Sequence, residues 1–183
     1  SGNQTEKPTD GDERSIVTTY VYNESSVYDF QDKTLYTELL LSRPSLIQAL
    51  DKDGDVISQR RFYHDNATRV TKPPTQGNLT KEEEWLNLPT VQWLPTTLTY
   101  DPYGNVTTVT DAATPPRTTI NTYDTTTHTY LIQIKNALGH TSQLTYDPRF
   151  GQVLISTDQN GVTTTTSYDP LGRVSKVIGP NDT

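Results

Sequence analysis

Short runs of alternating apolar and polar residues dominate the chain and predict β-strands separated by tight turns. SIVTTYVY at 15–22, SLIQAL at 45–50 and DVISQRRFY at 55–63 place β-branched and aromatic residues at the spacing of strands. The last two runs flank Asp-Lys-Asp-Gly at 51–54, so together they predict a β-hairpin. LYTELLL at 35–41 fits either a strand or a short helix that ends before Pro44.

Residues 71–95 break this pattern and predict an irregular, proline-rich loop. Four prolines, at 73, 74, 89 and 95, separate the segments KEEEWLNL and VQWL. Thr80 and Glu83 have the spacing of a helix capping box, so a short helix over 81–88 is an alternative for this part of the loop.

An internal repeat organises the second half of the chain. Tyr-Asp occurs at 100–101, 123–124, 146–147 and 168–169, which gives steps of about 23 residues. In the last two copies glycines recur every 10 to 12 residues, at Gly139, Gly151, Gly161 and Gly172. Each unit therefore predicts two strands and two turns, and such a hairpin must pair with its neighbours to bury a face.

The turns of the repeat have a recognisable chemistry. Asp-Pro-Tyr-Gly at 101–104 and Asp-Pro-Leu-Gly at 169–172 place Asp, Pro and Gly where a type I turn favours them. DPRFG at 147–151 is the same device with one more residue, and NALG at 136–139 and DQNG at 158–161 begin with Asn or Asp and end with Gly. The recurring tyrosines are expected to form a ladder across successive hairpins.

The amino-acid composition agrees with an all-β fold that has a small hydrophobic core. Threonine accounts for 33 of 183 residues and tyrosine for 11, and both favour half-buried strands. Only 31% of the chain is hydrophobic, so the core is thin, and residues 1–14 predict a tail or linker without structure. The absence of methionine, an initiator included, predicts a piece of a longer protein, and no apolar run is long enough to cross a bilayer as a helix.

The segments YDPYGNVTTVTD, NALGHTSQLTYDPRFGQVLISTDQNG and VTTTTSYDPLGRVSKV resemble the YD repeats of the Rhs family. The motif is a glycine, a strand, Tyr-Asp, two or three residues and a second glycine. It is complete at Gly139 to Gly151 and at Gly161 to Gly172, and half complete from Tyr100 to Gly104. The copy at Tyr123 departs from the motif, because Thr-Thr-Thr-His follows Asp124 where a DPxG turn is expected, which predicts a longer or irregular turn.

The resemblance implies an all-β fold in which antiparallel hairpins form a curved sheet, a section of a hollow shell in a large secreted or cell-surface protein. It covers residues 98–183 clearly, and residues 15–97 resemble less distinctly the β-rich segment that precedes such repeats in bacterial Rhs and toxin-complex B-type proteins. In the toxin members the shell encloses a C-terminal effector, while in the more distantly related teneurins a similar shell serves adhesion. The implied role is a non-catalytic scaffold, whose partners are neighbouring repeats or sheet edges of other copies. The residues that carry this structural role are Tyr100, Asp101, Gly104, Tyr123, Asp124, Gly139, Tyr146, Asp147, Gly151, Gly161, Tyr168, Asp169 and Gly172.

No pattern in the chain indicates an enzyme, a metal site or a cofactor. His64, His128 and His140 lack the spacing of paired metal ligands, which predicts that they are surface or turn histidines, and the chain has no cysteine. The alternating aspartates at 51, 53 and 55 resemble the start of a calcium loop, but the later ligand positions do not match. The run Glu82–Glu84 could supply the two carboxylates of a glycoside hydrolase, but neighbouring residues of a strand point to opposite faces, which disfavours that pairing. A net charge of −7 disfavours nucleic acid as a partner.

An extracellular carbohydrate-binding or adhesion module is the alternative function. Trp85, Trp93 and Tyr103 are the candidate binding residues, because exposed aromatic rings stack on sugar faces. The competing interpretation is that these rings pack on the sheet itself. N-x-S/T sequons begin at Asn3, Asn23, Asn66, Asn78, Asn105 and Asn181, which in a secreted eukaryotic protein would indicate glycan cover and otherwise reflect the abundance of threonine.

Overall fold

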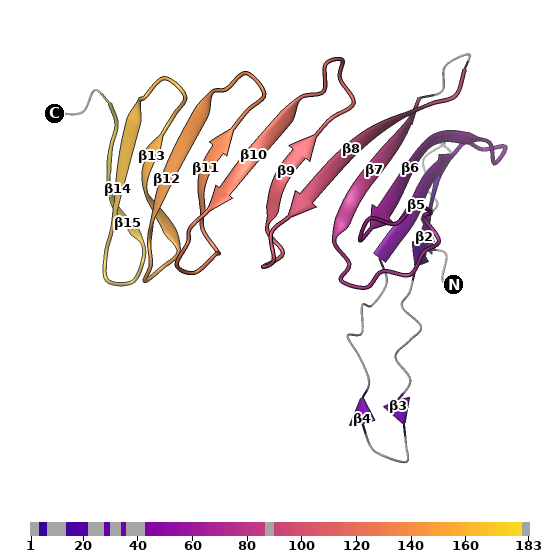
Figure 1. Ribbon diagram of the computed structural model, residues 1–183, viewed down its shortest axis with the longest axis horizontal. Coiled ribbons are helices and arrows are strands. Elements are labelled where there is room, and N and C mark those ends of the chain that lie inside the picture. The colour runs from indigo at the N-terminus through magenta and orange to yellow at the C-terminus, as the bar shows by residue number, and fades with distance from the viewer. Residues whose placement is uncertain are drawn as a thin grey trace. The chain divides into compact units, whose positions relative to one another are not determined.

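The computed structural model describes residues 4–6, 14–21, 28–29, 34–35, 43–86 and 90–180. All fifteen strands in this part of the chain pair in antiparallel fashion and it contains no helix, which confirms the predicted all-β hairpin class (Figure 1). The chain divides into two compact units, Ser1–Leu98 and Thr99–Thr183, and each is described by itself.

Unit 1 contains strands β1 to β7 and all but the last two residues of β8, and its main sheet has the order β1-β2-β5-β6-β7-β8. The strands β3 and β4 form a separate two-stranded pair. The sequence-predicted hairpin at 45–63 is confirmed as β5 and β6. The bounds are β1 Gln4–Glu6, β2 Ser15–Val21, β3 Tyr28–Asp29, β4 Thr34–Leu35, β5 Arg43–Leu50, β6 Val56–His64, β7 Leu79–Leu86 and β8 Gln92–Tyr100.

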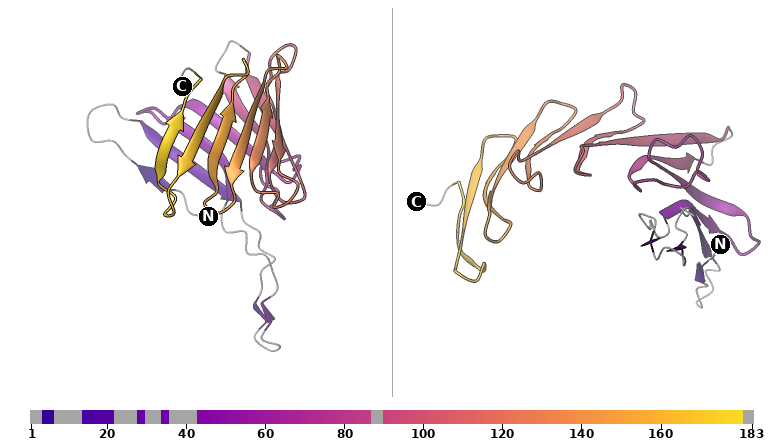
Figure 2. Two further views of the ribbon diagram at one scale, coloured as in Figure 1. Left: turned by 90° about the vertical axis from the view of Figure 1, so that its left-hand side faces the viewer. Right: turned by 60° about the horizontal axis from the view of Figure 1, so that its bottom comes forward.

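Unit 2 is a meander in which every strand pairs with the next along the chain. Figure 2 shows these hairpins, coloured orange to yellow, side by side. The strands predicted between the turns of the last two repeats are confirmed, and they are β12, β13 and β14. The bounds are β9 Val106–Thr110, β10 Thr118–Tyr123, β11 Leu131–Lys135, β12 Thr141–Asp147, β13 Gln152–Thr157, β14 Thr163–Tyr168 and β15 Val174–Ile178.

Two expectations for unit 1 are wrong. The proline-rich segment 71–95 is regular over much of its length, because Leu79–Leu86 is strand β7 rather than a helix and β8 begins at Gln92. The reason is cross-strand pairing with β6, which places Glu82 opposite Phe62 and Glu83 opposite Arg61. Arg60 and Tyr63, the β6 residues next to this pair, bind the two carboxylates, and these contacts outweigh the local capping signal. In the segment expected to lack structure, Gln4–Glu6 pairs with β2, and the rest of 1–13 lies outside the described residues, as do 36–41.

Hydrogen bonding between strands, rather than a deep core, holds each unit together. Among the described residues the buried apolar side chains are Val21, Phe62, Tyr63, Ala67 and Pro74, all of them in unit 1. Threonine hydroxyls bind one another across neighbouring strands, as between Thr110 and Thr118 at 2.9 Å and between Thr157 and Thr163 at 3.2 Å. Such cross-strand pairs stabilise a sheet without burying apolar area, which explains the threonine-rich composition.

Candidate structural site: the tyrosine-aspartate turns

A four-residue turn with an Asp or Asn at its start recurs through both units. In the copy at 169–172, the backbone N–H groups of Leu171 and Arg173 donate to Asp169 Oδ1 at 2.9 and 3.0 Å. The Gly172 N–H donates to the Asp169 carbonyl at 3.0 Å, and Gly172 has a φ of +78°. One carboxylate oxygen therefore satisfies two amides, and glycine supplies the left-handed backbone. The same pattern begins at Asp51, Asp101, Asn136 and Asp158.

These hydrogen bonds shift the acidity of the turn carboxylates. The N–H of Arg173 lowers the pKa of Asp169, and the N–H of Val162 lowers the pKa of Asp158. Asp169 also forms an ion pair with the Arg173 guanidinium at 2.7 Å. The carboxylates of these turns are therefore already bound by amides and, at Asp169, by the arginine that follows the turn, rather than open to a ligand.

Two turns differ from this pattern in the way the sequence indicates. At Asp147 the N–H groups of Phe150 and Gly151 both donate to the Asp147 carbonyl, which accommodates one more residue. At Asp124 the turn extends to Tyr130, whose carbonyl accepts from the Asp124 N–H at 2.9 Å. His128 takes the positive φ in this longer turn, and four backbone amides donate to the Asp124 carboxylate, which lowers its pKa far below the usual value.

Each repeat tyrosine of β10, β12 and β14 lies directly after a shift in strand register. The partner strand carries one extra residue opposite the step to Tyr123, Tyr146 and Tyr168. Such bulges increase the local twist of a sheet. The same side chains also tie neighbouring strands, because Tyr146 Oη donates to the Leu131 carbonyl at 3.0 Å and Tyr168 Oη to the Val153 carbonyl at 2.7 Å.

The hydroxyl contacts link one repeat to the one before it. Leu131 is the cross-strand partner of Tyr123, and Val153 is the partner of Tyr146. Each tyrosine hydroxyl therefore binds the backbone beside the previous repeat tyrosine. Burial raises the pKa of Tyr146 above its ordinary value, so the hydroxyl remains a donor to higher pH than an exposed tyrosine would.

Aromatic rings of one turn also lie against the following turn. Tyr103 stacks on His128 with ring centroids 3.8 Å apart, and Tyr130 stacks on Tyr146 at 4.9 Å. A Cβ placed on Gly172 would lie 3.0 Å from the ring of Phe150, whereas Gly104 has open space around it. Glycine at 172 is therefore required both by its backbone conformation and by the neighbouring ring.

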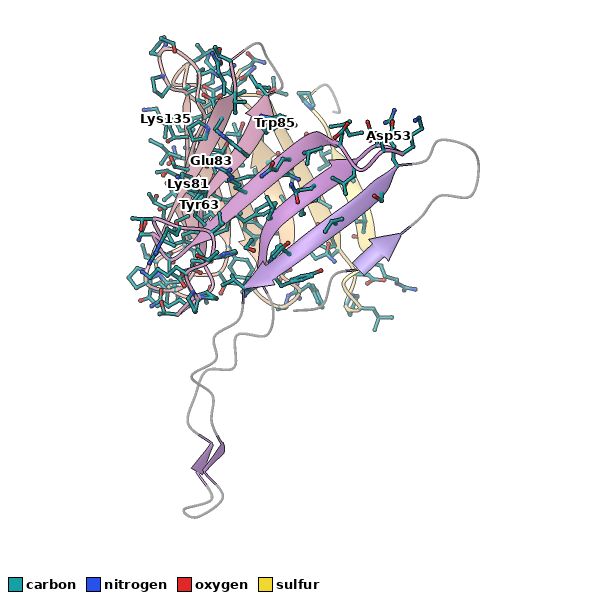
Figure 3. The ribbon with its side chains drawn as sticks, turned by 90° about the vertical axis from the view of Figure 1, so that its right-hand side faces the viewer. Asp53, Tyr63, Lys81, Glu83, Trp85 and Lys135 are labelled. Atoms are coloured by element: carbon teal, nitrogen blue, oxygen red, sulfur yellow. The ribbon has the colours of Figure 1, made fainter. Side chains whose placement is uncertain are left out.

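The candidate binding residues of unit 1 belong to a cluster of charged and aromatic side chains on one face of β6, β7 and β8. Trp85 and Trp93 lie directly opposite each other, and the Arg61 guanidinium sits 3.7 Å from the centroid of the Trp93 ring. Figure 3 shows Lys81, Glu83 and Trp85 along β7, beside Tyr63. We name Arg61, Tyr63, Lys81, Glu83, Trp85 and Trp93 the unit 1 cluster.

The polar groups of the unit 1 cluster bind one another. Tyr63 Oη donates to Glu83 Oε2 at 2.6 Å, and Lys81 Nζ lies 2.9 Å from Glu83 Oε1 and 3.8 Å from the centroid of the Tyr63 ring. The Tyr63 hydroxyl and the Lys81 ammonium lower the pKa of Glu83 in spite of its burial. Arg61 covers one face of Trp93, as His128 covers one face of Tyr103 in unit 2. The three candidate binding rings are not brought together within one unit, since Tyr103 belongs to unit 2.

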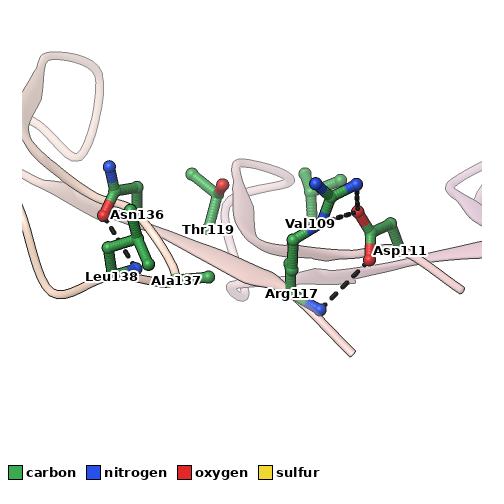
Figure 4. Close-up of a pocket in the computed structure, with 7 residues that line it drawn as sticks. All are labelled: Val109, Asp111, Arg117, Thr119, Asn136, Ala137 and Leu138. Atoms are coloured by element: carbon green, nitrogen blue, oxygen red, sulfur yellow. Dashed lines mark hydrogen bonds and ion pairs between the residues drawn. The ribbon is translucent and has the colours of Figure 1, made fainter. Parts of the chain in front are cut away.

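Unit 2 also contains a depression of about 340 Å³ (Figure 4). Arg117 and Asp111 line it as an ion pair at 2.6 Å, and the Asp111 carboxylate also accepts from the N–H groups of Ala113 and Arg117. The charges at this depression are therefore matched to each other. Within the described ranges no group of three or more His, Asp or Glu side chains is placed to hold a metal ion, and no helix is long and apolar enough to span a membrane.

Sequence reasoning missed the bulges, the hydroxyl contacts and the ring-to-turn packing. For the bulges and the hydroxyl contacts, the only sequence signal was the constant position of Tyr before Asp. A register shift depends on the pairing of residues on two strands, and one strand's sequence does not show that pairing. The third depends on residues in neighbouring repeats, such as Phe150 and Gly172, which no single repeat reveals.

Comparison with known proteins supports the resemblance stated above. Residues 149–183 match the family described as RHS Repeat, which confirms the resemblance to this family over that segment. No curated protein matches the sequence.

Among solved structures the chain is similar to TcdB2-TccC3, with a TM-score of 0.63 at 12% identity over 90% of this chain and 11% of that one. It also matches TcdB2-TccC3-TEV, with a TM-score of 0.48 at 17% identity over 94% of this chain and 10% of that one. A third match is the Photorhabdus luminescens Tc holotoxin pore, with a TM-score of 0.48 at 15% identity over 91% of this chain and 9% of that one. The chain therefore spans about a tenth of the length of each of these proteins, and the first match supports the same hairpin fold.

Proposed function

We propose that this chain is a structural, non-catalytic section of a β-hairpin wall, and that the wall belongs to a large secreted or cell-surface protein and encloses or presents a C-terminal effector. The starting point is the RHS Repeat match at 149–183 together with the fold shared with TcdB2-TccC3. The observation that carries the proposal is the continuity between neighbouring hairpins. Each one binds the next through strand pairing, tyrosine hydroxyls and turn packing.

The mechanism follows from this continuity. A sheet whose hairpins are tied at both backbone and side-chain level resists local opening, because a hairpin can separate only by breaking several contacts at once. Such a wall separates its contents from solvent and proteases. In the turn at 169–172 the aspartate carboxylate is bound by backbone amides and by the arginine that follows the turn. These contacts stabilise the turn, and they occupy the carboxylate that a catalytic role would require.

The alternative, a carbohydrate-binding module, has less support. One face of the Trp93 ring and one face of the Tyr103 ring are covered by Arg61 and His128. The Glu83 carboxylate, which would bind sugar hydroxyls, is already bound by Tyr63 and Lys81. We therefore expect no specific signal on a glycan array, and no change in any weak signal when Trp85 or Trp93 is replaced by alanine.

Protease protection tests the wall directly. In the full-length protein that contains these residues, a segment inside the wall should survive digestion that removes exposed segments. Gly172→Ala, which places a methyl group against Phe150, should accelerate digestion of that segment, while Gly104→Ala should have a smaller effect. Equal digestion of the enclosed segment in the wild type, in both variants and in a denatured control would refute enclosure. A specific glycan hit that is lost on Trp85→Ala would favour the alternative.

A further inference from the structure

In unit 1 the sequence His64-Asp65 occupies the structural place that Tyr-Asp holds in unit 2. The register of β6 against β7 shifts between Tyr63 and His64, and Thr80 is the extra residue on the partner strand. The same shift precedes the repeat tyrosines of β10, β12 and β14. The Asp65 N–H then donates to the Asn78 carbonyl at 2.8 Å, as the Asp124 N–H does to the Tyr130 carbonyl. The bulge and the Asp hydrogen bond therefore match those of the repeat, with histidine in the place of tyrosine.

Asp65 organises the connection that follows, residues 65–78. Its carboxylate accepts the backbone N–H groups of Thr75, Gln76, Gly77 and Asn78 at 2.6 to 2.9 Å. These bonds lower the pKa of Asp65 in spite of its burial. The connection therefore closes back onto the residue next to His64, so a disturbance at His64 acts where the connection begins.

His64 itself is buried, with 6% of its surface exposed, beside Phe62 and Tyr63 at 7% each. Its cross-strand partner on β7 is the uncharged Leu79. The charged groups that act on it are Arg43 at the start of β5 and Asp65 in the connection. Elsewhere on β7, Glu82 is paired with Arg60, and Glu83 with Lys81 and Tyr63.

The surroundings favour the neutral imidazole. Burial lowers the pKa of His64, the Asp65 carboxylate opposes this, and Arg43 lowers it further. Because the folded form then binds fewer protons than the unfolded form, folding stability is lost as pH falls through the ordinary histidine value of about 6.5. A protonated His64 would be a buried positive charge within the influence of Arg43, which is itself exposed.

We propose that the His64-Asp65 connection is an acid-sensitive joint in unit 1, which loosens over residues 65–78 in mildly acidic solution, at about pH 5 to 6. The equivalent positions of unit 2 carry tyrosine, which does not change charge in this range, so the hairpins of unit 2 remain closed. The joint is a property of the chain whether or not it forms a wall. In a wall, it would be the place where opening begins on acidification.

Hydrogen exchange at pH 7.5 and pH 5.5, corrected for the intrinsic pH dependence of exchange, tests the joint in the 183-residue chain. We expect amides of 65–78 to lose protection at pH 5.5 in the wild type. His64→Tyr restores the residue found in unit 2, and it should keep this protection at both pH values. The matched control is His140→Gln, which changes an exposed histidine of unit 2 and should behave as the wild type.

Two outcomes would overturn the proposal. One is an equal loss of protection at 65–78 in the wild type and in His64→Tyr. The other is an NMR titration of wild-type His64 that gives an ordinary or raised pKa, and this measurement decides the matter if His64→Tyr and a second variant, His64→Phe, fail to fold. Neither result depends on whether the full-length protein encloses an effector, so the joint and the proposed function fail separately.

Discussion

Gly172 offers the sharpest test of the packing between turns, because Gly104 provides a matched control. Both glycines stand at the fourth position of an Asp-Pro-x-Gly turn, and both have a left-handed backbone, with φ of +78° and +87°. They differ in their surroundings. A Cβ on Gly172 would lie 3.0 and 3.1 Å from two ring carbons of Phe150, whereas a Cβ on Gly104 would meet nothing within 4 Å.

The expected magnitudes follow from this difference. Alanine in the left-handed region costs about 1 to 2 kcal/mol, and a stiffer unfolded chain returns about 0.4 to 1 kcal/mol. Gly104→Ala should therefore destabilise unit 2 by about 1 kcal/mol. Gly172→Ala should add the cost of forcing the Phe150 ring aside, about 1 to 3 kcal/mol by analogy with overpacked cores.

Urea unfolding of the 183-residue chain, followed by circular dichroism, measures both changes. Phe150→Leu removes the aromatic edge, so it should cost less in the Gly172→Ala background than in the wild type. The difference between the two is the coupling energy of ring and glycine. Equal losses for Gly104→Ala and Gly172→Ala, with no coupling to Phe150, would refute the reasoning that the turns support one another.

Three further predictions concern other contacts. Tyr168→Phe removes the hydroxyl that binds the Val153 carbonyl at 2.7 Å, and it should cost about 1 kcal/mol in the free energy of unfolding of unit 2. Asp158→Asn keeps the oxygen that accepts the turn amides but removes a carboxyl whose pKa is lowered by folding. In the wild type this carboxylate stabilises the fold above about pH 4, and the stabilisation is lost as pH falls further. The free energy of unfolding of the variant should therefore change less with pH in the acidic range. Arg61→Ala uncovers one face of Trp93, so the tryptophan emission should shift to longer wavelength.

Each of these has a control in the chain. Tyr103→Phe changes a tyrosine that is 62% exposed, and a loss equal to that of Tyr168→Phe would show that the hydroxyl contact adds nothing. Asp53→Asn changes an exposed aspartate, and it should leave the acid unfolding profile as in the wild type. The emission measurement uses a Trp85→Phe background, so that one tryptophan remains, with exposed Lys72→Ala as the control; an unchanged spectrum in Arg61→Ala would contradict the stacking.

The turns were predictable from sequence because their chemistry is local. In Asp-Pro-Leu-Gly at 169–172 the acceptor, the fixed φ and the left-handed residue lie within four positions, and the hydrogen bonds form between those same residues and the next. The strands between such turns followed from the alternation of side chains. The start of the repeat region at residue 98 remains a prediction, which the division of the chain into two units after Leu98 supports. How far the repeat extends toward the N-terminus also remains a prediction.

The remaining features depend on partners far apart in the chain. The sequence predicts an irregular loop, with a short helix as the alternative, where strand β7 lies. The prolines and the Thr80–Glu83 capping pattern are local signals, whereas Tyr63, which binds Glu83, is 20 residues away. His64 was interpreted as a surface or turn histidine, yet it is buried. The residues next to His64 in the sequence do not indicate its burial, because the burial comes from adjacent strands and from the connection at 65–78.

Packing between turns also limits how such a chain can change during evolution. Because Phe150 rests on Gly172, and Tyr130 on Gly151, each hairpin fixes part of the sequence of the hairpin that follows it. A duplication or exchange that cuts at the boundary between two hairpins would separate a ring from its glycine. A cut within a strand does the same, because the pairs Tyr130–Gly151 and Phe150–Gly172 overlap and leave no uncrossed position between residues 130 and 172. We therefore expect exchanged segments to be tolerated only where the new neighbour keeps the matching ring or glycine.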